Sequence, residues 1–289
     1  MKNNDRHREA GTLYVVSTPI GNLEDITLRS LKVLGEVERI AAESVDHTRV
    51  LCERYGIKTR LTPYNQHNRK TRGPELLRRL KSGQNVALVT NAGAPGVSDP
   101  GVSLVREVLN QGIRVAPVPG PSAVTAALSA AGFPAERFLF FGFLSHKKGR
   151  RRKELKALER EPYTLVFFEA PRRLMATLED ICDILGNRPM VLFKEMTKMF
   201  EKVVGGSVRD ILERIRLGGE IRGEHTLVVA GSDKQEKSEG IDKEIENRID
   251  DLLKKEDMSV RDMARQISSE SGRDYRTIYK ACIQRKRAL

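Results

Sequence analysis

Residues 86–101 read VALVTNAGAPGVSDPG, and this stretch decides the fold of the chain. Its first four residues, Val86–Val89, are all apolar, which is the pattern of a strand buried on both faces of a parallel sheet. The small residues 92–96 follow, where glycine and absent side chains let a ligand approach the main chain closely. Asp99-Pro100-Gly101 then turns the chain into a helix. This succession predicts a ligand site at the carboxyl edge of a parallel sheet, although a tight connection without a ligand has the same pattern.

The same unit of a strand and a small-residue turn recurs on both sides of that stretch. Leu13–Val16 leads into a turn at 17–23, and Ile113–Pro117 leads into Pro119-Gly120-Pro121-Ser122-Ala123. Strands and helices alternate over residues 12–132, which indicates an α/β domain. The first strand is not followed by G-x-G-x-x-G, so an ordinary dinucleotide site is not expected.

Two helices of this region have predicted inward faces. The helix at 26–33 is expected to bury Leu28 and Leu31. The helix after Gly101 is expected to bury the apolar residues of one face, which are Val102, Val105, Val108 and Leu109.

From Arg137 onward the pattern changes to a second α/β layer with a more mixed sheet. Phe138–Phe143 predicts a strand, and 191–194 with 202–205 predicts a hairpin. Ser207 and Asp210 fit a capping box at the start of a helix. The fold class is therefore α/β, with an N-terminal α/β domain at 12–133 and a C-terminal α/β domain at 134–231.

The end of the chain has a different composition. Residues 232–240 are polar and charged and predict a linker, and 241–289 predict a small C-terminal helical module that resembles a helix-turn-helix. Nucleic-acid contact by this module is one interpretation, and a solubilising or dimerising bundle is the other. The interpretation rests on the cations of its last helix region: Arg273, Arg276, Lys280, Arg285, Lys286 and Arg287.

Composition limits the function classes. Lys and Arg number 51 against 39 Asp and Glu, so the chain of 289 residues carries +12, and such an excess favours a polyanionic partner. No apolar run approaches the ~18 residues of a membrane span. Residues 1–11 are polar and predict a loose tail without a signal peptide. The three cysteines are far apart, which argues against disulfides and zinc and for the cytoplasm.

Seven collinear blocks resemble one protein family. The blocks are STPIGNLEDIT (17–27), HTRVL (47–51), NAGAPGVSDPG (91–101), VPGPSAVTAALSAAG (118–132), GFLSHKKGRR (142–151), FFEAPRRL (167–174) and KEMTK (194–198). They are similar to the tetrapyrrole methylase superfamily and, within it, to the ribosomal RNA small subunit methyltransferase I type. The resemblance spans residues 12–231, and the tail is similar to the helical module of that type.

The resemblance implies a homodimeric enzyme with S-adenosylmethionine in a cleft between two α/β domains. Enzymes of this type methylate a cytidine ribose 2′-hydroxyl in the decoding region of 16S ribosomal RNA, so the expected partner is that RNA or the small ribosomal subunit. Carried over position by position, the cofactor would contact Pro19, Ala92, Gly93, Ala94, Val97, Ser122, Ala123, Phe168, Met196 and Thr197.

Two further sets of residues are candidates for chemistry and for RNA contact. A ribose hydroxyl is a weak acid, so a general base assists its attack. The ionisable residues near motif ends that could supply it are Glu43, His47, Asp99, Glu169 and Glu195. The run after the Phe-rich strand predicts phosphate contacts through Lys147, Lys148, Arg150, Arg151, Arg152 and Lys153.

The chain departs from the family pattern at polar loop positions, while its strands, glycines and prolines persist. These positions are Ser44, Val45, Asp46, Asn65, Gln66, Arg69, Asn91 and Ala94. The main hypothesis is an RNA methyltransferase, and the alternative is a degraded paralogue that binds RNA or ribosomal subunits without methylating them. A tetrapyrrole substrate is a third hypothesis, disfavoured because the opening G-x-G-x-G-D of such enzymes is absent.

Overall fold

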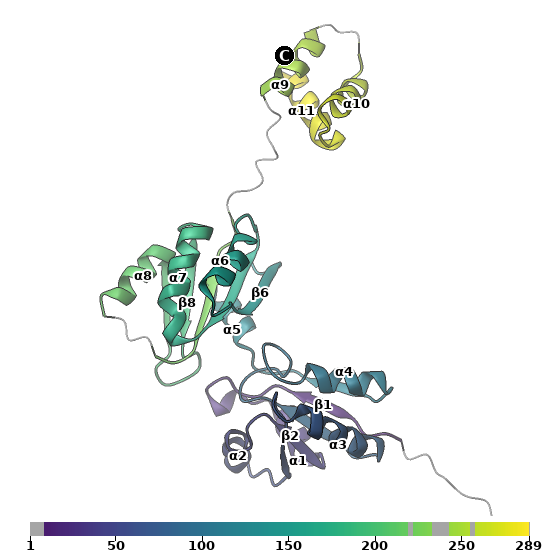
Figure 1. The fold of residues 1–289 in the computed structure, drawn as a ribbon, viewed down its shortest axis with the longest axis vertical. Helices are drawn as coiled ribbons and strands as arrows, with labels where there is room; N and C mark the ends of the chain where they lie inside the picture. The colour runs from purple at the N-terminus through teal and green to yellow at the C-terminus, as the bar shows by residue number, and fades with distance from the viewer. Residues whose placement is uncertain (1–8, 219–221, 233–242, 255–257, 289) are drawn as a thin grey trace, which may run out of the picture. The chain divides into compact units, whose positions relative to one another are not determined.

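The computed structural model describes residues 9–218, 222–232, 243–254 and 258–288 (Figure 1). Most of the predicted tail and linker, 1–8 and 233–240, lies outside these residues. The chain divides into two compact units, one of residues 1–159 and 163–231 and the other of residues 160–162 and 232–289. Both sheets belong to the first unit. The boundary predicted between two α/β domains stays a prediction.

The first sheet is entirely parallel, with the strand order β3-β2-β4-β1-β5. All four residues of the central strand β4 are buried, because helices cover both faces of the sheet. β3 is an edge strand of this sheet. The strands are β1 (Leu13–Val16), β2 (Arg39–Ala42), β3 (Leu61–Pro63), β4 (Val86–Val89) and β5 (Val115–Val118).

The helices of this half correct the two predicted inward faces. Thr27 caps α1, which therefore starts at Leu28, and Leu28 is 87% exposed while Val33 and Leu34 are buried. In α4, Leu104 and Val108 face the core, which confirms the prediction for Val108, whereas Val102 and Leu109 are exposed, contrary to the prediction. The elements are the short 3₁₀ turn η1 (Leu23–Asp25), α1 (Leu28–Glu36), α2 (Val45–Arg54), α3 (Arg69–Lys81), α4 (Val102–Asn110) and α5 (Ala123–Ala131).

The second sheet is mixed, as the sequence predicted, with the order β6-β7-β10-β8-β9. β6 and β7 are parallel and the other neighbours antiparallel, with β8 and β9 forming the expected hairpin partners. Ser207 and Asp210 form the predicted capping box. The elements are β6 (Phe138–Phe143), α6 (Lys148–Lys156), β7 (Thr164–Glu169), α7 (Pro171–Leu185), β8 (Pro189–Lys194), β9 (Lys202–Ser207), α8 (Val208–Arg216) and β10 (His225–Val229).

Helix α5 joins the two halves of this unit. Its apolar residues, among them Val124 and Leu128, pack against Val166, Phe193 and Val228 of the second sheet (Figure 1). The small side chains of α5 allow that close approach. As a result, the turn before α5 lies where the strand ends of the first sheet meet the second sheet.

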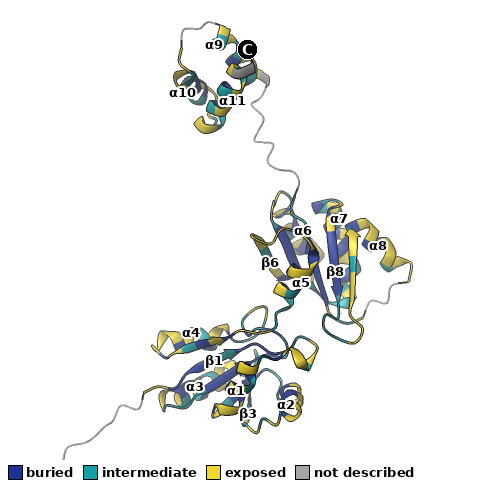
Figure 2. Cartoon of the chain, turned by 180° about the vertical axis from the view of Figure 1, so that it is seen from behind, coloured by how far each residue is buried: buried dark blue, intermediate teal, exposed yellow. Residues whose placement is uncertain are grey.

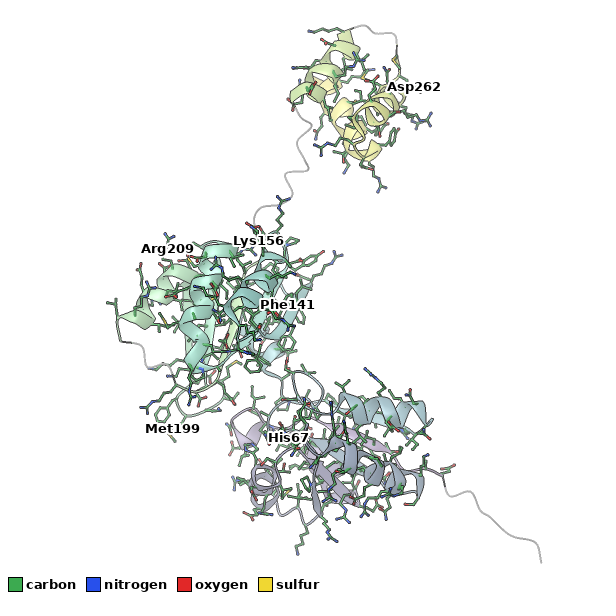
Figure 3. The ribbon with its side chains drawn as sticks, in the orientation of Figure 1. His67, Phe141, Lys156, Met199, Arg209 and Asp262 are labelled. Carbon is green, nitrogen blue, oxygen red and sulfur yellow. The ribbon has the colours of Figure 1, made fainter. Side chains whose placement is uncertain are left out.

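The second unit consists of three helices, α9 (Lys243–Lys254), α10 (Val260–Ser271) and α11 (Tyr275–Ala288). Their core includes Ile249, Met263 and Ile278, which are buried. Figure 2 colours these helices, like the rest of the described chain, by burial. Ser259 caps α10 by accepting from the backbone N–H of Asp262, labelled in Figure 3. Of the helices in the part of the chain that the structure describes, none is long and apolar enough to span a membrane.

Candidate functional site

A cavity of about 280 Å³, the first cavity, lies between the strand-end loops of the first sheet and the second sheet. Several segments of the sequence converge on it, among them the loop after β4, the turn before α5, the end of β7 and the start of β10. It gathers all but two of the residues predicted for the cofactor, namely Ala92, Gly93, Ala94, Val97, Ser122, Ala123, Phe168 and Met196. Their role in binding a cofactor stays a prediction.

The loop after β4 is fixed by the turn after β1. The N–H of Thr18 donates to the Gly93 carbonyl, and the N–H of Gly93 donates to the Thr18 carbonyl, both at 3.0 Å. The Thr18 hydroxyl also donates to the Thr90 carbonyl at 3.0 Å. Gly93 has a φ of +70°, a conformation that favours glycine. These bonds hold the small-residue loop in place beneath the cavity and leave its surface free of bulky side chains.

The remaining two predicted cofactor residues lie elsewhere. Pro19 lines a neighbouring cavity of about 400 Å³, the second cavity. Thr197 lines neither cavity, and its hydroxyl accepts the N–H of Asn22 at 3.0 Å. The two cavities share Ile20, Ala92 and Glu224, and the polar lining of the second also includes Thr18, His47, Thr48, Thr90, Asn91 and Lys198.

Three of the five candidate bases are occupied by contacts. The buried carboxylate of Glu169 accepts from Arg173 at 2.7 Å and from the Thr177 hydroxyl at 2.6 Å, so it is an ion-pair partner. Glu43 accepts the N–H of Asn91 at 3.1 Å and thereby fixes the loop. Glu195 accepts from Lys198 at 3.0 Å. Burial opposes ionisation of Glu195, but hydrogen bonds from the Glu224 backbone and Lys198 prevail and lower its pKa.

Asp99 differs from those three carboxylates. It lines the first cavity and forms no ion pair with any residue that the structure describes. Burial, and then the nearby charge of Glu43, raise the pKa of Asp99 to about 6, although a hydrogen bond from Thr90 works in the opposite direction. His47, the fifth candidate, is exposed on α2 and lines the second cavity. Asp99 is therefore the candidate carboxylate whose pKa the surrounding structure raises.

Two residues at the start of β10 line the first cavity and had no sequence signal. Glu224 is shared with the second cavity, and its carboxylate pairs with Lys198 at 3.0 Å. His225 is buried with its Nδ1 unpartnered, and burial, followed by the charge of Lys194, lowers its pKa. A lone acid or histidine at a strand start has no pattern that distinguishes it from a core or surface residue.

The predicted cation cluster is only partly available for phosphate. Arg151 is buried and pairs with Asp180 at 2.6 Å, so its inclusion in an RNA surface was wrong. Arg152 is also tied to Asp180 and to Asp183. Sequence could not reveal this, because the acids lie on α7, about 30 residues away. The exposed cations of the cluster, the basic face, are Lys147, Lys148, Arg150 and Lys153.

The positions that depart from the family pattern lie on the cavities and around them. Asn91 lines the second cavity and Ala94 the first. Asp46 forms an exposed pair with Arg49 at 2.9 Å, next to Val45 and the helix cap Ser44. A third cavity of about 110 Å³ is lined by Asp99 together with Asn65, Gln66 and Arg69.

In the helical unit, one cation of the last helix is already paired. Arg285 contacts Glu246 at 2.9 Å and also pairs with Asp250. Arg276 and Lys280 are exposed. Nucleic-acid contact by this unit stays a prediction.

Comparisons with known proteins agree with this arrangement. The family model described as Tetrapyrrole (Corrin/Porphyrin) Methylases matches residues 12–212. The chain is 48% identical over 228 residues to ribosomal RNA small subunit methyltransferase I of Escherichia coli O157:H7, covering 78% of this chain and 80% of that one. It is 41% identical over 279 residues to the protein of the same name from Pseudomonas aeruginosa, covering 96% and 98%.

Solved structures show the same fold. Uroporphyrin-III-C-methyltransferase of Thermus thermophilus aligns with a TM-score of 0.56 at 24% identity, over 76% of this chain and 94% of that one. Another structure of that enzyme, complexed with S-adenosyl homocysteine, aligns with a TM-score of 0.56 at 21% identity, over 76% and 97%. A cobalt precorrin-4 methyltransferase aligns with a TM-score of 0.59 at 19% identity, over 76% and 94%.

Proposed function

This chain belongs to the tetrapyrrole (corrin/porphyrin) methylase family, in its ribosomal RNA small subunit methyltransferase I group, and from this membership we propose that it methylates a cytidine ribose 2′-hydroxyl in the decoding region of 16S ribosomal RNA. The methyl donor is S-adenosylmethionine. The relatives carry the name of an RNA methyltransferase, which supports this function rather than a paralogue that has lost methylation.

A homodimer and a cytoplasmic location complete the proposal. Both rest on the family resemblance.

The observation that carries the proposal is the first cavity, where three small-residue turns converge. S-adenosylmethionine supplies an electrophilic methyl group on a positively charged sulfur. Backbone carbonyls of the loop at 92–94 suit that charge, and backbone N–H groups at the start of α5 suit a carboxylate. Phe168 and Met196 supply apolar surface for an aromatic base. In-line transfer depends mainly on positioning, which a cavity built on two sheets provides.

Asp99 is the general base in this proposal. It lines the first cavity and its pKa of about 6 lies near operating pH, where a general base works most efficiently. A proton taken from the ribose hydroxyl at Asp99 leaves an oxygen that attacks the methyl carbon as the carbon–sulfur bond breaks.

Replacing Gly93 by Val is expected to weaken S-adenosylmethionine binding about 10- to 100-fold, measured by calorimetry. The new Cβ would lie 3.7 Å from Ile20 Cγ2, so the branched side chain must extend into the cavity. Overfilling a packed site costs ~1–3 kcal/mol.

Gly112→Val is the matched control for backbone strain. Gly112 has nearly the same φ, +68°, but is exposed after α4 with nothing within 4 Å of its Cβ position. It should lose similar folding stability and keep the affinity of the unaltered protein. Equal affinities for the two variants would place the cofactor away from the loop at 92–94.

The basic face is the proposed contact for the RNA backbone. If its four cations each engage a phosphate of single-stranded RNA, log affinity should fall with log salt at a slope of about −3, taking ~0.7 per contact. The triple variant Lys147→Gln, Lys148→Gln, Lys153→Gln should flatten the slope by about 2, as measured by fluorescence anisotropy.

The control for that variant removes three exposed cations from the other half of the unit: Lys32→Gln, Lys58→Gln and Arg106→Gln. A fall in slope that is the same for both triple variants would mean that the net charge of the chain, and not the basic face, attracts RNA.

A further inference from the structure

We infer that the second cavity receives the base of the target nucleotide, turned out of the RNA stack, and that Asn91 is the residue that contacts its polar edge. This inference rests on the proposed function, because it assigns the acceptor side of the same reaction. The second cavity measures about 400 Å³, within the range of sites for small organic molecules.

The position of the second cavity suits an acceptor. It shares Ile20, Ala92 and Glu224 with the first cavity, so the two spaces meet at these side chains. A nucleotide with its base in the second cavity therefore has its ribose at the junction, next to the cavity assigned to the methyl donor. Sequence-specific recognition of RNA usually reads bases that are splayed out of the stack, and the second cavity provides a receiving site for such a base.

A strained loop contributes residues to both cavities. Glu195 and Thr197 have φ values of +52° and +64°, which non-glycine residues rarely adopt. The loop presses on Gly21 so closely that a Cβ there would lie 2.5 Å from Lys198 Cγ. Met196 of this loop lines the first cavity, and Lys198 lines the second. Met199, labelled in Figure 3, follows the loop and is 91% exposed.

The side chain of Asn91 has a buried polar atom without a hydrogen-bond partner. Its backbone N–H is held by Glu43, whereas its side-chain Oδ1 is buried and has no hydrogen-bond partner. A buried unpaired carbonyl oxygen is costly, and a donor from a ligand would remove that cost. A side-chain amide offers one acceptor and two donors, which matches the exocyclic amine and ring nitrogen at one edge of cytosine. The apolar residues Leu23, Val50 and Leu51 supply the walls that a base face needs.

Filling the second cavity tests the inference. Val50 lines it from α2 and is 57% exposed, so Val50→Trp adds bulk there without entering the core. Leu28→Trp is the control, since Leu28 is 87% exposed on α1 and lines neither cavity. Val50→Trp should bind S-adenosylmethionine within about twofold of the unaltered protein and methylate small ribosomal subunits at least about tenfold more slowly. Leu28→Trp should bind S-adenosylmethionine and methylate small ribosomal subunits like the unaltered protein.

A binding measurement separates this inference from the proposed function. The full chain, saturated with S-adenosylhomocysteine, is titrated with two single-stranded RNAs that are identical except at one position. That position is a cytidine in one RNA and an abasic ribose in the other. The unaltered protein should prefer the cytidine RNA by about tenfold, in keeping with ~1–3 kcal/mol for one bound base. Val50→Trp and Asn91→Leu should lose that preference, and Leu28→Trp should keep it.

The outcomes are distinct. A protein that shows the base preference but transfers no methyl group to small subunits would contradict the proposed function and retain the inference. Base preference that survives in Val50→Trp and Asn91→Leu would overturn the inference, as would its absence in the unaltered protein. Loss of S-adenosylmethionine binding by Val50→Trp would also overturn it, because the second cavity would then belong to the cofactor.

Discussion

Asp99→Asn is expected to slow methyl transfer to small ribosomal subunits about 10²–10⁴-fold, the usual contribution of a general base. Asparagine keeps the size of the side chain but cannot accept the proton of the ribose hydroxyl. The measurement is the single-turnover rate with saturating S-adenosylmethionine. Binding of the cofactor is measured separately, because Asp99 also lines the first cavity.

The protonation state of Asp99 sets the direction in which the rate changes with pH. The base is active as a carboxylate, so with a pKa of about 6 the value of kcat/KM should rise with pH through 6 and level off above it. Once the positively charged cofactor is bound, it favours the carboxylate, so the corresponding rise in kcat should lie at lower pH. Asp99→Asn should remove both rises.

Asp25→Asn serves as the control, since Asp25 is exposed in the short 3₁₀ turn and lines neither cavity. A rise through pH 6 that persists in Asp99→Asn would assign the base to another group.

Asp180→Ala is expected to destabilise the α/β unit by about 3–5 kcal/mol, the cost of leaving a buried charge without its partner. The side chains of Arg151 and Asp180 are only 6% and 3% exposed, and their atoms approach to 2.6 Å. Urea unfolding measures the change, and the thermal midpoint should fall by roughly 10 °C.

Two variants support that interpretation. Asp183 lies on the same helix as Asp180 and makes an exposed ion pair with Arg152, so Asp183→Ala should cost only ~0–1 kcal/mol of folding stability. Replacing both buried partners, Arg151→Met with Asp180→Leu, should restore most of the stability, because no buried charge remains. A small effect of Asp180→Ala would mean that Arg151 reaches water, and would return it to the basic face.

Local sequence patterns predicted much of the first sheet. The strands at 13–16 and 86–89 have the predicted bounds, because a short apolar run between turn residues specifies a buried strand without reference to distant parts of the chain. The same holds for the capping box at Ser207 and Asp210, whose bonds join residues three apart. The small-residue turns were visible for the same reason, and the structure brings them to one cavity.

The sequence predicted less accurately which face of a helix is buried. The apolar residues Leu28, Val102 and Leu109 fit a helical period but are exposed, because other residues of the same helices face the core. Apolar residues that lie on more than one face of a helix do not specify which face is buried. Packing against the sheet decides it.

The sequence by itself determined the family, the alternation of strands and helices in an α/β fold, and the turns that could hold a methyl donor. Only the tertiary structure decided that Arg151 is buried against Asp180, that Glu224 and Asn91 lie on the second cavity, and that Asp99 has a raised pKa. The physical reason is the range of the interactions. Strands, caps and turns follow from neighbouring residues, whereas burial, ion pairing and a shifted pKa depend on groups that are distant in the chain and meet only in the folded protein.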